Sequence, residues 1–198
     1  MLPADAVVPV KTGARAKLRL AHVLGAGARN LLVESLLRHV IGVLGEAGLR
    51  VTCVRSGDLG WTGGADVMRQ HGPGLNAAVR EGLADTGTPA VVVAADMPWI
   101  TAESVIRLTR EPGDVVVAAT RDGGTGALLL RRSLPPAFGP RSALRHAQVA
   151  RQAGLWARVV SIPGLDRDLD DEPALAAALA TAPGMDAQLR DQLRGSRR

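Results

Sequence analysis

Apolar residues along the chain follow two patterns, short continuous runs and longer stretches with a helical period. The runs at 5–10 (DAVVPV) and 89–95 (PAVVVAA) are rich in valine and alanine, as expected for strands buried on both faces of a parallel sheet. The stretch at 26–48 instead repeats its leucines and valines every three or four positions and ends at glycine, which predicts a helix. Because such runs and stretches alternate, the pattern predicts an α/β fold, a three-layer α/β/α sandwich with a mostly parallel sheet.

The remaining elements follow from the same two patterns. The stretch at 56–74 holds six glycines and is expected to be a loop. Thr101 is a residue type that caps helices, so a helix is expected to start there. We expect further strands at 50–55, 114–119, 127–130 and 157–161, and further helices at 75–85, 140–154 and 172–182.

Length, charge and composition narrow the class of protein. The 198 residues suit a single domain, which we place at 1–185, followed by a basic C-terminal tail at 186–198 whose order the sequence leaves open. Four arginines against two aspartates give that tail +2 of the net charge of +5, and aromatic residues are only 2% of the chain. Neither a duplex-binding face nor a base-stacking surface is therefore indicated. A single cysteine, Cys53, excludes an intramolecular disulfide.

Targeting signals are missing from the sequence as given. No apolar run approaches about 18 residues, the length of a membrane-spanning helix. The first residues lack the basic segment of a signal peptide. We therefore expect a cytoplasmic protein with no membrane partner and no nucleic-acid partner.

Carboxylates follow two of the predicted strands. Ligands of such sheets bind at the carboxyl ends of the strands, and Asp96 stands just after the strongest apolar run. Asp168 and Asp170 follow the last predicted strand and alternate, so an extended segment would turn both to one face. Mg²⁺ prefers such oxygen ligands together with substrate phosphates. The alternative is a pair of solvated acidic loops.

The first strand is followed by a cationic turn, VPVKTGARAKLRL. Lys11 and Lys17 are the only lysines among 24 basic residues, and they stand six positions apart near the expected start of a helix. Helix N-termini also favour anions, so this turn suits a polyphosphate. The spacing of a Walker A loop is missing. The alternative is a solvated basic helix face.

Three glycine-rich segments could bind the rest of a nucleotide or a phosphate. In HGPGLNAAV (71–79), Gly74 permits close approach of the backbone and Asn76 can read a base or ribose; the alternative is a turn with Asn76 as helix cap. In DGGTGALLL (122–130) and FGPRSALRH (138–146), Thr125 and Ser142 can face a phosphate; the alternative is ordinary helix capping by Ser142. The sequence leaves the role of His146 open.

Together these features predict two phosphate-binding regions and an acidic metal site at one edge of the sheet. No Ser/His/Asp or Cys/His arrangement of a nucleophilic enzyme stands out. That combination favours phosphoryl or nucleotidyl transfer, in which catalysis is mainly positioning and charge neutralisation.

Six segments, in the same order, resemble the guanylyltransferase family of coenzyme F420 biosynthesis, which acts on phosphoenolpyruvate or 2-phospho-L-lactate. The segments, which span about residues 6–180, are VPVK…AK.RL, GPGLNAAV, ADMP, GGTGALLL, FGP.S…H and PGL.RDLD. The resemblance implies a Rossmann-like nucleotidyltransferase fold, GTP as donor and Mg²⁺ as cofactor. It also implies a small phosphorylated three-carbon acid as acceptor, with 3-phosphoglycerate a third candidate, and a downstream deazaflavin transferase as partner.

The resemblance further implies a role for each matched residue. Asp96, Asp168 and Asp170 are expected to bind the metal, and Lys11 and Lys17 to face the GTP phosphates as catalytic residues. The remaining residues divide between the two substrates: Gly74, Leu75 and Asn76 at the nucleotide, and Thr125, Gly139 and Ser142 at the phosphate of the acceptor. The heavy use of alanine, glycine and arginine, with few lysines, indicates a G+C-rich genome, which favours phosphoenolpyruvate as the acceptor.

Two other functions remain open from the sequence. One is a related nucleotidyltransferase that loads a molybdopterin or sugar phosphate, although the LxAGxGxR turn of those enzymes is missing after the first strand. The other is a non-enzymatic nucleotide-binding or nucleic-acid-binding protein that uses the basic tail.

Overall fold

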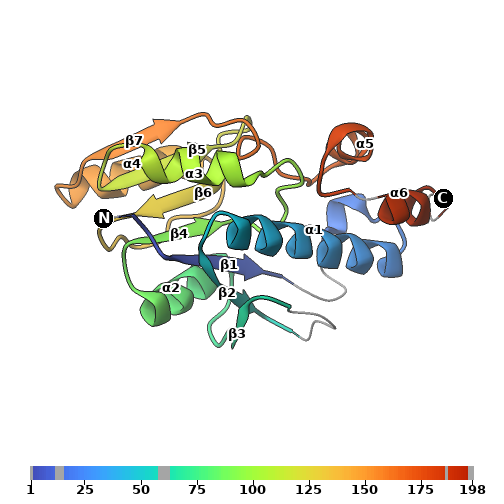
Figure 1. Ribbon diagram of the computed structural model, residues 1–198, viewed down its shortest axis with the longest axis horizontal. Helices are drawn as coiled ribbons and strands as arrows, with labels where there is room; N and C mark the ends of the chain where they lie inside the picture. The colour runs from blue at the N-terminus through green and yellow to red at the C-terminus, as the bar shows by residue number, and fades with distance from the viewer. Residues whose placement is uncertain (1, 12–15, 58–62, 186, 196–198) are drawn as a thin grey trace.

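The valine-rich runs form the centre of a seven-stranded sheet in the computed structural model, which describes residues 2–11, 16–57, 63–185 and 187–195 (Figure 1). The strands are β1 (Asp5–Val10), β2 (Arg50–Arg55), β3 (Asp66–Arg69), β4 (Ala90–Val93), β5 (Val115–Ala119), β6 (Thr125–Leu130) and β7 (Ala157–Val160), in the spatial order β3-β2-β1-β4-β6-β5-β7. The α/β fold with a mostly parallel sheet is confirmed, since only β6 runs antiparallel to its neighbours.

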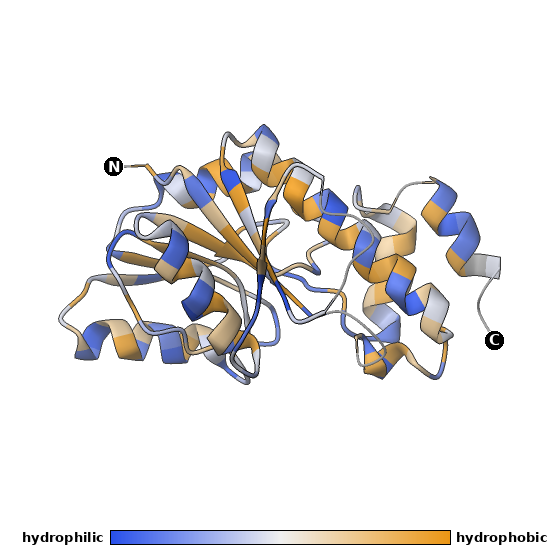
Figure 2. Ribbon diagram, turned by 90° about the horizontal axis from the view of Figure 1, so that it is seen from below, coloured by the Kyte–Doolittle hydropathy of each residue, from blue (hydrophilic) through white to orange (hydrophobic). Residues whose placement is uncertain are grey.

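Helices cover both faces of this sheet. They are α1 (Ala26–Glu46), α2 (Leu75–Thr86), α3 (Ala102–Arg110), α4 (Ser142–Gln152), α5 (Glu172–Thr181) and α6 (Ala187–Gly195), with a short 3-10 turn, η1, at Leu18–Leu20. Side chains alternate across each strand: Val8 packs toward α1 and α3, and Val7 packs toward α2 and α4. Figure 2 shows the resulting apolar strands between helices whose polar residues face outward.

The antiparallel direction of β6 decides which edge of the sheet its first residue reaches. β5 and β6 are joined by a short turn at 120–124, so β6 starts at the edge where β1, β4, β5 and β7 end. The strand expected at 127–130 therefore begins earlier, at Thr125. Its second residue, Gly126, accepts a hydrogen bond from the Ala94 backbone just after β4.

A separate apolar cluster lies beyond the end of the sheet, where α5 and α6 meet the N-terminal half of α1 (Figure 1). Leu32 and Leu36 of α1 pack there with Trp99, and α6 adds Leu189 and Leu193, all buried. The residues expected to form a basic tail thus include a packed helix; residues 186 and 196–198 lie outside the described residues.

Two further observations differ from or extend the sequence-based expectations. The glycine-rich stretch at 56–74, expected to be a loop, contains strand β3 at its far end. Thr101 caps α3 as expected, in a reciprocal pair of hydrogen bonds with Ser104. Among the described residues, no helix is long and apolar enough to cross a membrane.

Candidate functional site

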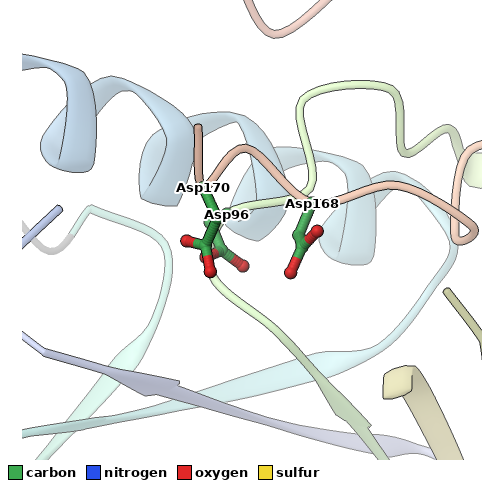
Figure 3. Close-up of side chains that lie close together, drawn as sticks. All are labelled: Asp96, Asp168 and Asp170. Carbon is green, nitrogen blue, oxygen red and sulfur yellow. The ribbon is translucent and has the colours of Figure 1, made fainter. Parts of the chain in front are cut away.

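Three carboxylates meet at the edge of the sheet where β4 and β7 end. Asp96 follows β4, and Asp168 and Asp170 lie on the segment between β7 and α5. The Leu169 backbone N–H donates to the Asp96 carbonyl over 3.0 Å, and the Leu169 side chain is fully buried. Because Leu169 points into the core, its two neighbours both point out of it, to one face. The predicted grouping of these three aspartates is what the structure has (Figure 3).

The cluster is a concentrated negative charge. One carboxylate oxygen from each of Asp96, Asp168 and Asp170 lies within 4.8 Å of the others. Burial, and then the charges of Asp96, Asp170 and Asp122, raise the pKa of Asp168 to about 6. Oxygen donors of this number and charge are what hard divalent cations take as ligands. The three carboxylates could therefore hold a metal ion.

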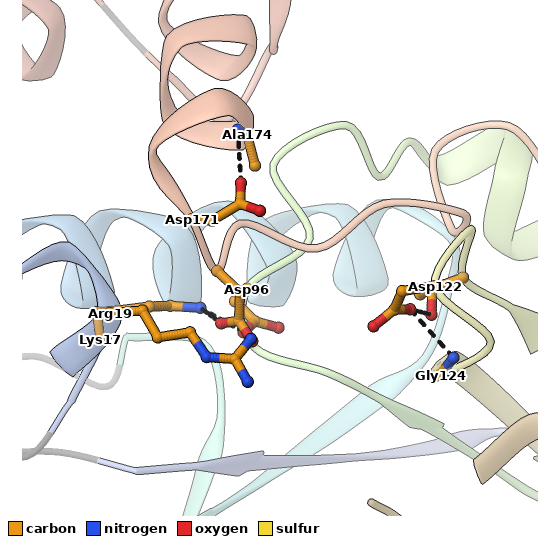
Figure 4. Close-up of polar contacts among 9 residues, drawn as sticks. Lys17, Arg19, Asp96, Asp122, Gly124, Asp171 and Ala174 are labelled. Atoms are coloured by element: carbon orange, nitrogen blue, oxygen red, sulfur yellow. Dashed lines mark hydrogen bonds and ion pairs between the residues drawn. The ribbon is translucent and has the colours of Figure 1, made fainter. Parts of the chain in front are cut away.

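Lys17 brings a positive charge to the same place. Its Nζ lies 2.5 Å from Asp96 Oδ2 and 2.7 Å from Asp170 Oδ1, and its side chain is 8% exposed (Figure 4). Burial alone would lower the pKa of Lys17, but the two carboxylates outweigh it and raise the pKa above its ordinary value. The exposed Arg19 guanidinium stands 3.9 Å from Asp170. The expected contact of Lys17 with a nucleotide stays a prediction, since its contacts in the structure are with the carboxylates.

The backbone at Lys17 is unusual. Its φ of 49° and ψ of 42° lie in the left-handed region, which residues other than glycine rarely adopt. Lys17 stands directly before η1, which aims its side chain back toward the end of β4. Such strained positions persist where surrounding contacts determine them, and they gather at functional sites.

A pocket of about 710 Å³ opens beside the carboxylates. Its wall includes both sequence-predicted lysines, Lys11 and Lys17, as well as Gly74 and Leu75. Leu75 is 48% exposed there although it is a large apolar side chain, and Gly74 has a φ of 83° that favours glycine. The wall also includes Asp96 and Asp170, two of the three clustered carboxylates.

Part of the wall of that pocket is a tight loop at 70–74 held by side chains. The Glu81 carboxylate accepts hydrogen bonds from the backbone of His71 and Gly72 over 2.8 and 2.7 Å. The Gln70 side-chain amide donates to the carbonyls of Gly72 and Gly74. These contacts fix the conformation of the loop, and its glycines let a ligand approach the backbone closely.

Asn76 is the one nucleotide-assigned residue that lies outside the pocket wall. Its Nδ2 donates to the Phe138 carbonyl over 3.1 Å, and its Oδ1 accepts from the Phe138 backbone N–H over 2.8 Å. Its place at the nucleotide stays a prediction. Its contacts link the start of α2 to the loop that carries Gly139.

A second polar group is formed by the residues assigned to the acceptor. Thr125 at the start of β6 and Ser142 at the start of α4 are both buried, and their hydroxyl oxygens lie 2.9 Å apart. Gly139 has a φ of 128° and accepts a hydrogen bond from the Ser142 backbone, which turns the chain into α4. The structure thus brings together the three residues that the sequence proposed, and it adds His146, whose Nδ1 lies 3.1 Å from Thr125 Oγ1.

Asp122 is a carboxylate of this edge that the sequence analysis did not single out. It accepts hydrogen bonds from Thr120 Oγ1 and the Gly124 backbone, and these bonds lower the pKa of Asp122 (Figure 4). Its charge in turn helps to raise the pKa of Asp168. Its position after β5 matches that of Asp96 after β4, which is the signal that could have identified it.

Comparison with known proteins explains this arrangement. Residues 4–194 match the model of the family described as "Guanylyl transferase CofC like". The chain belongs to this family. The match spans all seven strands and the carboxylate cluster, so this family member is a nucleotidyltransferase.

Named relatives of this family member act on different acceptors. It is 36% identical over 194 residues to phosphoenolpyruvate guanylyltransferase from Roseiflexus castenholzii, covering 93% of this chain and 91% of the relative. It is 38% identical over 199 residues to 3-phospho-D-glycerate guanylyltransferase from Phenylobacterium zucineum, covering 91% of each.

The fold of this family member is shared with more distant nucleotidyltransferases. One is 2-C-methyl-D-erythritol 4-phosphate cytidylyltransferase from Thermus thermophilus, with a TM-score of 0.55 and 16% identity over 90% of this chain and 98% of that one. At that identity the likeness concerns the fold alone, and it confirms the Rossmann-like nucleotidyltransferase architecture.

Proposed function

We propose that this chain transfers GMP from GTP to phosphoenolpyruvate and releases pyrophosphate. A phosphate oxygen of the acceptor attacks the α-phosphorus of GTP and forms the new P–O bond. The bond from the α-phosphorus to the bridging oxygen breaks, and pyrophosphate leaves with that electron pair. The acceptor phosphate is already largely ionised at neutral pH, so the step needs no general base.

The observation that carries this proposal is the common edge of the two polar groups. The carboxylates and the lysine-lined pocket stand at the end of β4, and the buried Thr125–Ser142 pair stands where β6 starts beside it. A donor nucleotide and a phosphorylated acceptor placed in these two sites would approach each other across the end of one pair of strands.

Each group has a role that its chemistry supports. Gly74 and Leu75 would hold the nucleoside, and Asn76 would position the start of α2 beside it through its bonds to Phe138. Lys11 would face the leaving pyrophosphate, and Lys17 would exchange its present carboxylate partners for phosphate oxygens. The acceptor phosphate would lie on the hydroxyls of Thr125 and Ser142, with the Gly139 backbone beside them.

Asp96, Asp168 and Asp170 would hold Mg²⁺. When bound there, the ion would supply Lewis-acid polarisation of phosphate oxygens and charge neutralisation. The raised pKa of Asp168 supports this, because carboxylates that repel one another gain most from a shared cation.

The acceptor and the onward reaction complete the proposal. Phosphoenolpyruvate is favoured by the first relative and by the G+C-rich composition, while 2-phospho-L-lactate and 3-phosphoglycerate carry the same phosphate on a three-carbon acid. The product would be enolpyruvyl-diphospho-guanosine, an activated ester consumed by a deazaflavin transferase.

The test measures release of pyrophosphate from GTP, in the presence of Mg²⁺, with each of the three acceptors in turn. Each acceptor is assayed without and with a coupled deazaflavin transferase. We expect pyrophosphate release with phosphoenolpyruvate and with neither of the other two acceptors. Release with another of the three would correct the acceptor, and silence with all three, coupled assay included, would refute the proposal.

The metal assignment has its own test in the same assay. Asp96→Asn is expected to reduce turnover by at least about 100-fold, since it removes a charged ligand from the reacting centre. Asp85→Asn, on the exposed side of α2, is the matched control and should leave turnover unchanged. Retained activity in Asp96→Asn at unchanged thermal stability would remove Asp96 from the metal site.

A further inference from the structure

His146 is a fully buried imidazole that none of the proposed steps uses. It lies on α4, and its ring packs edge-on against the Phe138 ring with centroids 4.7 Å apart. Both ring nitrogens have hydrogen-bond partners. Nε2 lies 2.9 Å from the Ala137 backbone nitrogen, and Nδ1 lies 3.1 Å from Thr125 Oγ1.

These partners fix which ring nitrogen carries the proton. A backbone N–H can only donate, so Nε2 must accept from Ala137 and is unprotonated. Burial, and then the charge of Arg145, lower the pKa of His146 to about 4, so the ring is neutral near pH 7. The single proton of the neutral ring is therefore on Nδ1, which donates to Thr125 Oγ1.

This tautomer sets the direction of the hydroxyl pair. Thr125 Oγ1 already accepts from His146, and the Thr125 and Ser142 oxygens are 2.9 Å apart, close enough to share one hydroxyl hydrogen. The pair has two hydroxyl hydrogens, so the second is left to donate outside the pair. With the opposite tautomer, Thr125 would spend its hydrogen on Nδ1 and the pair would have one donor fewer.

We infer that His146 is a positioning residue that keeps the Thr125–Ser142 hydroxyl pair a hydrogen-bond donor toward an oxyanion, the phosphate of the acceptor. The inference rests on the proposed function, which places that phosphate on these hydroxyls. Neighbouring contacts keep the ring from turning. Phe138 packs edge-on against it, and Asn76 binds both backbone polar groups of Phe138.

Two amide variants separate the donor role from simple packing. The side-chain nitrogen of His146→Asn can stand near the place of Nδ1 and still donate to Thr125. The longer His146→Gln side chain reaches the place of Nε2, where its oxygen accepts from Ala137 and Thr125 loses its donor. Both variants remove the ring, and the smaller asparagine leaves the larger void at this buried position, so packing alone predicts that His146→Asn is at least as disruptive as His146→Gln.

Steady-state kinetics give the first readout. We expect His146→Gln to raise the KM for the acceptor about tenfold, the equivalent of one neutral hydrogen bond, with the KM for GTP unchanged. His146→Asn should keep the acceptor KM within about threefold of wild type. Equal changes in both variants, a larger change in His146→Asn, or parallel changes in both KM values would overturn the inference.

Two readouts do not depend on turnover. Nitrogen-15 NMR of the histidines, with the His146 signals assigned by their loss in His146→Asn, should show a neutral ring protonated on Nδ1 at pH 7; a ring protonated on Nε2 would overturn the inference even if a variant fails to fold. Titration with inorganic phosphate should give about tenfold weaker binding in His146→Gln than in His146→Asn. If wild type is silent with every acceptor, the proposed function fails, whereas equal phosphate binding, or none, is what overturns the role of His146.

Discussion

Lys17 holds a buried ammonium against two carboxylates of the proposed metal site. Without that charge, Asp96 and Asp170 would repel each other and Asp168 across a space of a few ångströms. The left-handed backbone at Lys17 shows that the fold accepts local strain to place this charge. Lys17 therefore offsets part of the negative charge of the site before any ligand enters, and the raised pKa of Asp168 reflects the repulsion that remains.

The variant Lys17→Met tests how much this positive charge contributes to stability. In a chelator, the variant is expected to lose about 1–3 kcal/mol of unfolding free energy, because the partly solvated carboxylates lose their counter-charge. Added Mg²⁺ should then raise its thermal midpoint more than that of wild type. Lys11→Met is the control for stability, since Lys11 is exposed. Equal Mg²⁺ effects on Lys17→Met and wild type would contradict this account.

Asp168→Asn should stabilise the metal-free protein. Burial and the neighbouring carboxylates raise the pKa of Asp168 from 3.8 to about 6, so its ionised form is unfavourable in the folded state. The folded protein then holds this proton more tightly than the unfolded chain, and wild type loses stability as pH rises from about 4 to about 6. Asp168→Asn should increase the unfolding free energy by about 1 kcal/mol after solvent screening. This increase should be complete above pH 6 and become smaller below it.

Thermal unfolding in a chelator at pH 7.5 and pH 4.5 checks this. Asp85→Asn serves again as the exposed control. A gain that is the same at both pH values would mean that charge relief is not its source.

Of the site, the sequence predicts the residues that stand near the ends of recognisable strands, and it does not predict how distant residues pair. Asp96 and Asp168 could be placed at one edge because each follows a recognisable apolar run, whereas the edge that Thr125 reaches also depends on the direction of β6. The pairing of Lys17 with Asp96 and Asp170 could not, since it joins residues 79 and 153 positions apart through a left-handed turn. Likewise, nothing in the sequence indicates that Asn76 binds the backbone of Phe138.

At the scale of elements, the sequence predicts strands whose residues are mostly buried, and it does not predict an exposed strand. The predicted bounds of β1 and β2 match the structure because β1 is apolar nearly throughout and the buried centre of β2 lies between two arginines that mark its ends. β3 is mostly exposed, reads DVMR, and so carries no hydrophobic signal. The direction of β6 is also invisible, since a continuous apolar run is alike in parallel and antiparallel strands.

Helix α2 packs closely on the sheet at Gly82, which leaves no room there for a side chain. A Cβ at this position would lie 2.5 Å from Val7 Cγ1 and 2.9 Å from Val54 Cγ2. Gly82→Ala should therefore destabilise the protein by about 1–3 kcal/mol through overpacking, despite the better helix propensity of alanine.

Gly42→Ala in α1 is the matched variant, because nothing lies within 4 Å of the added carbon. It should stabilise by about 0.5–1 kcal/mol. Chemical denaturation of both variants measures the pair, and the same sign of change in the two would contradict the packing argument.

At the scale of the whole molecule, the C-terminal residues close the far end of the apolar core. Arg190, counted with the basic tail in the sequence analysis, donates to the backbone carbonyls of Leu179, Ala182 and Met185. These are carbonyls around the end of α5 that need such donors. Part of the positive charge at this end of the chain is thus used inside the fold, which composition alone could not indicate.

Leu193→Ala tests that closure. Leu193 is fully buried between α6 and the first half of α1, so its truncation should cost about 2–4 kcal/mol. Gln188→Ala, on the exposed side of the same helix, should change stability little. Differential scanning calorimetry compares the two, and an unchanged midpoint for Leu193→Ala would mean that α6 is not part of the folding unit.

The close approach of the chain at Leu165 to Gly126 has a consequence for distinguishing active from inactive relatives by sequence. A side chain there would overlap the Leu165 carbonyl oxygen and approach the end of Met97, so any larger residue would push away the segment that leads to Asp168. A homologue could keep all three aspartates and still present them out of register if this glycine were replaced. This one backbone position therefore gives a filter, independent of the acidic residues, for separating active transferases from relatives that retain the carboxylates without the geometry.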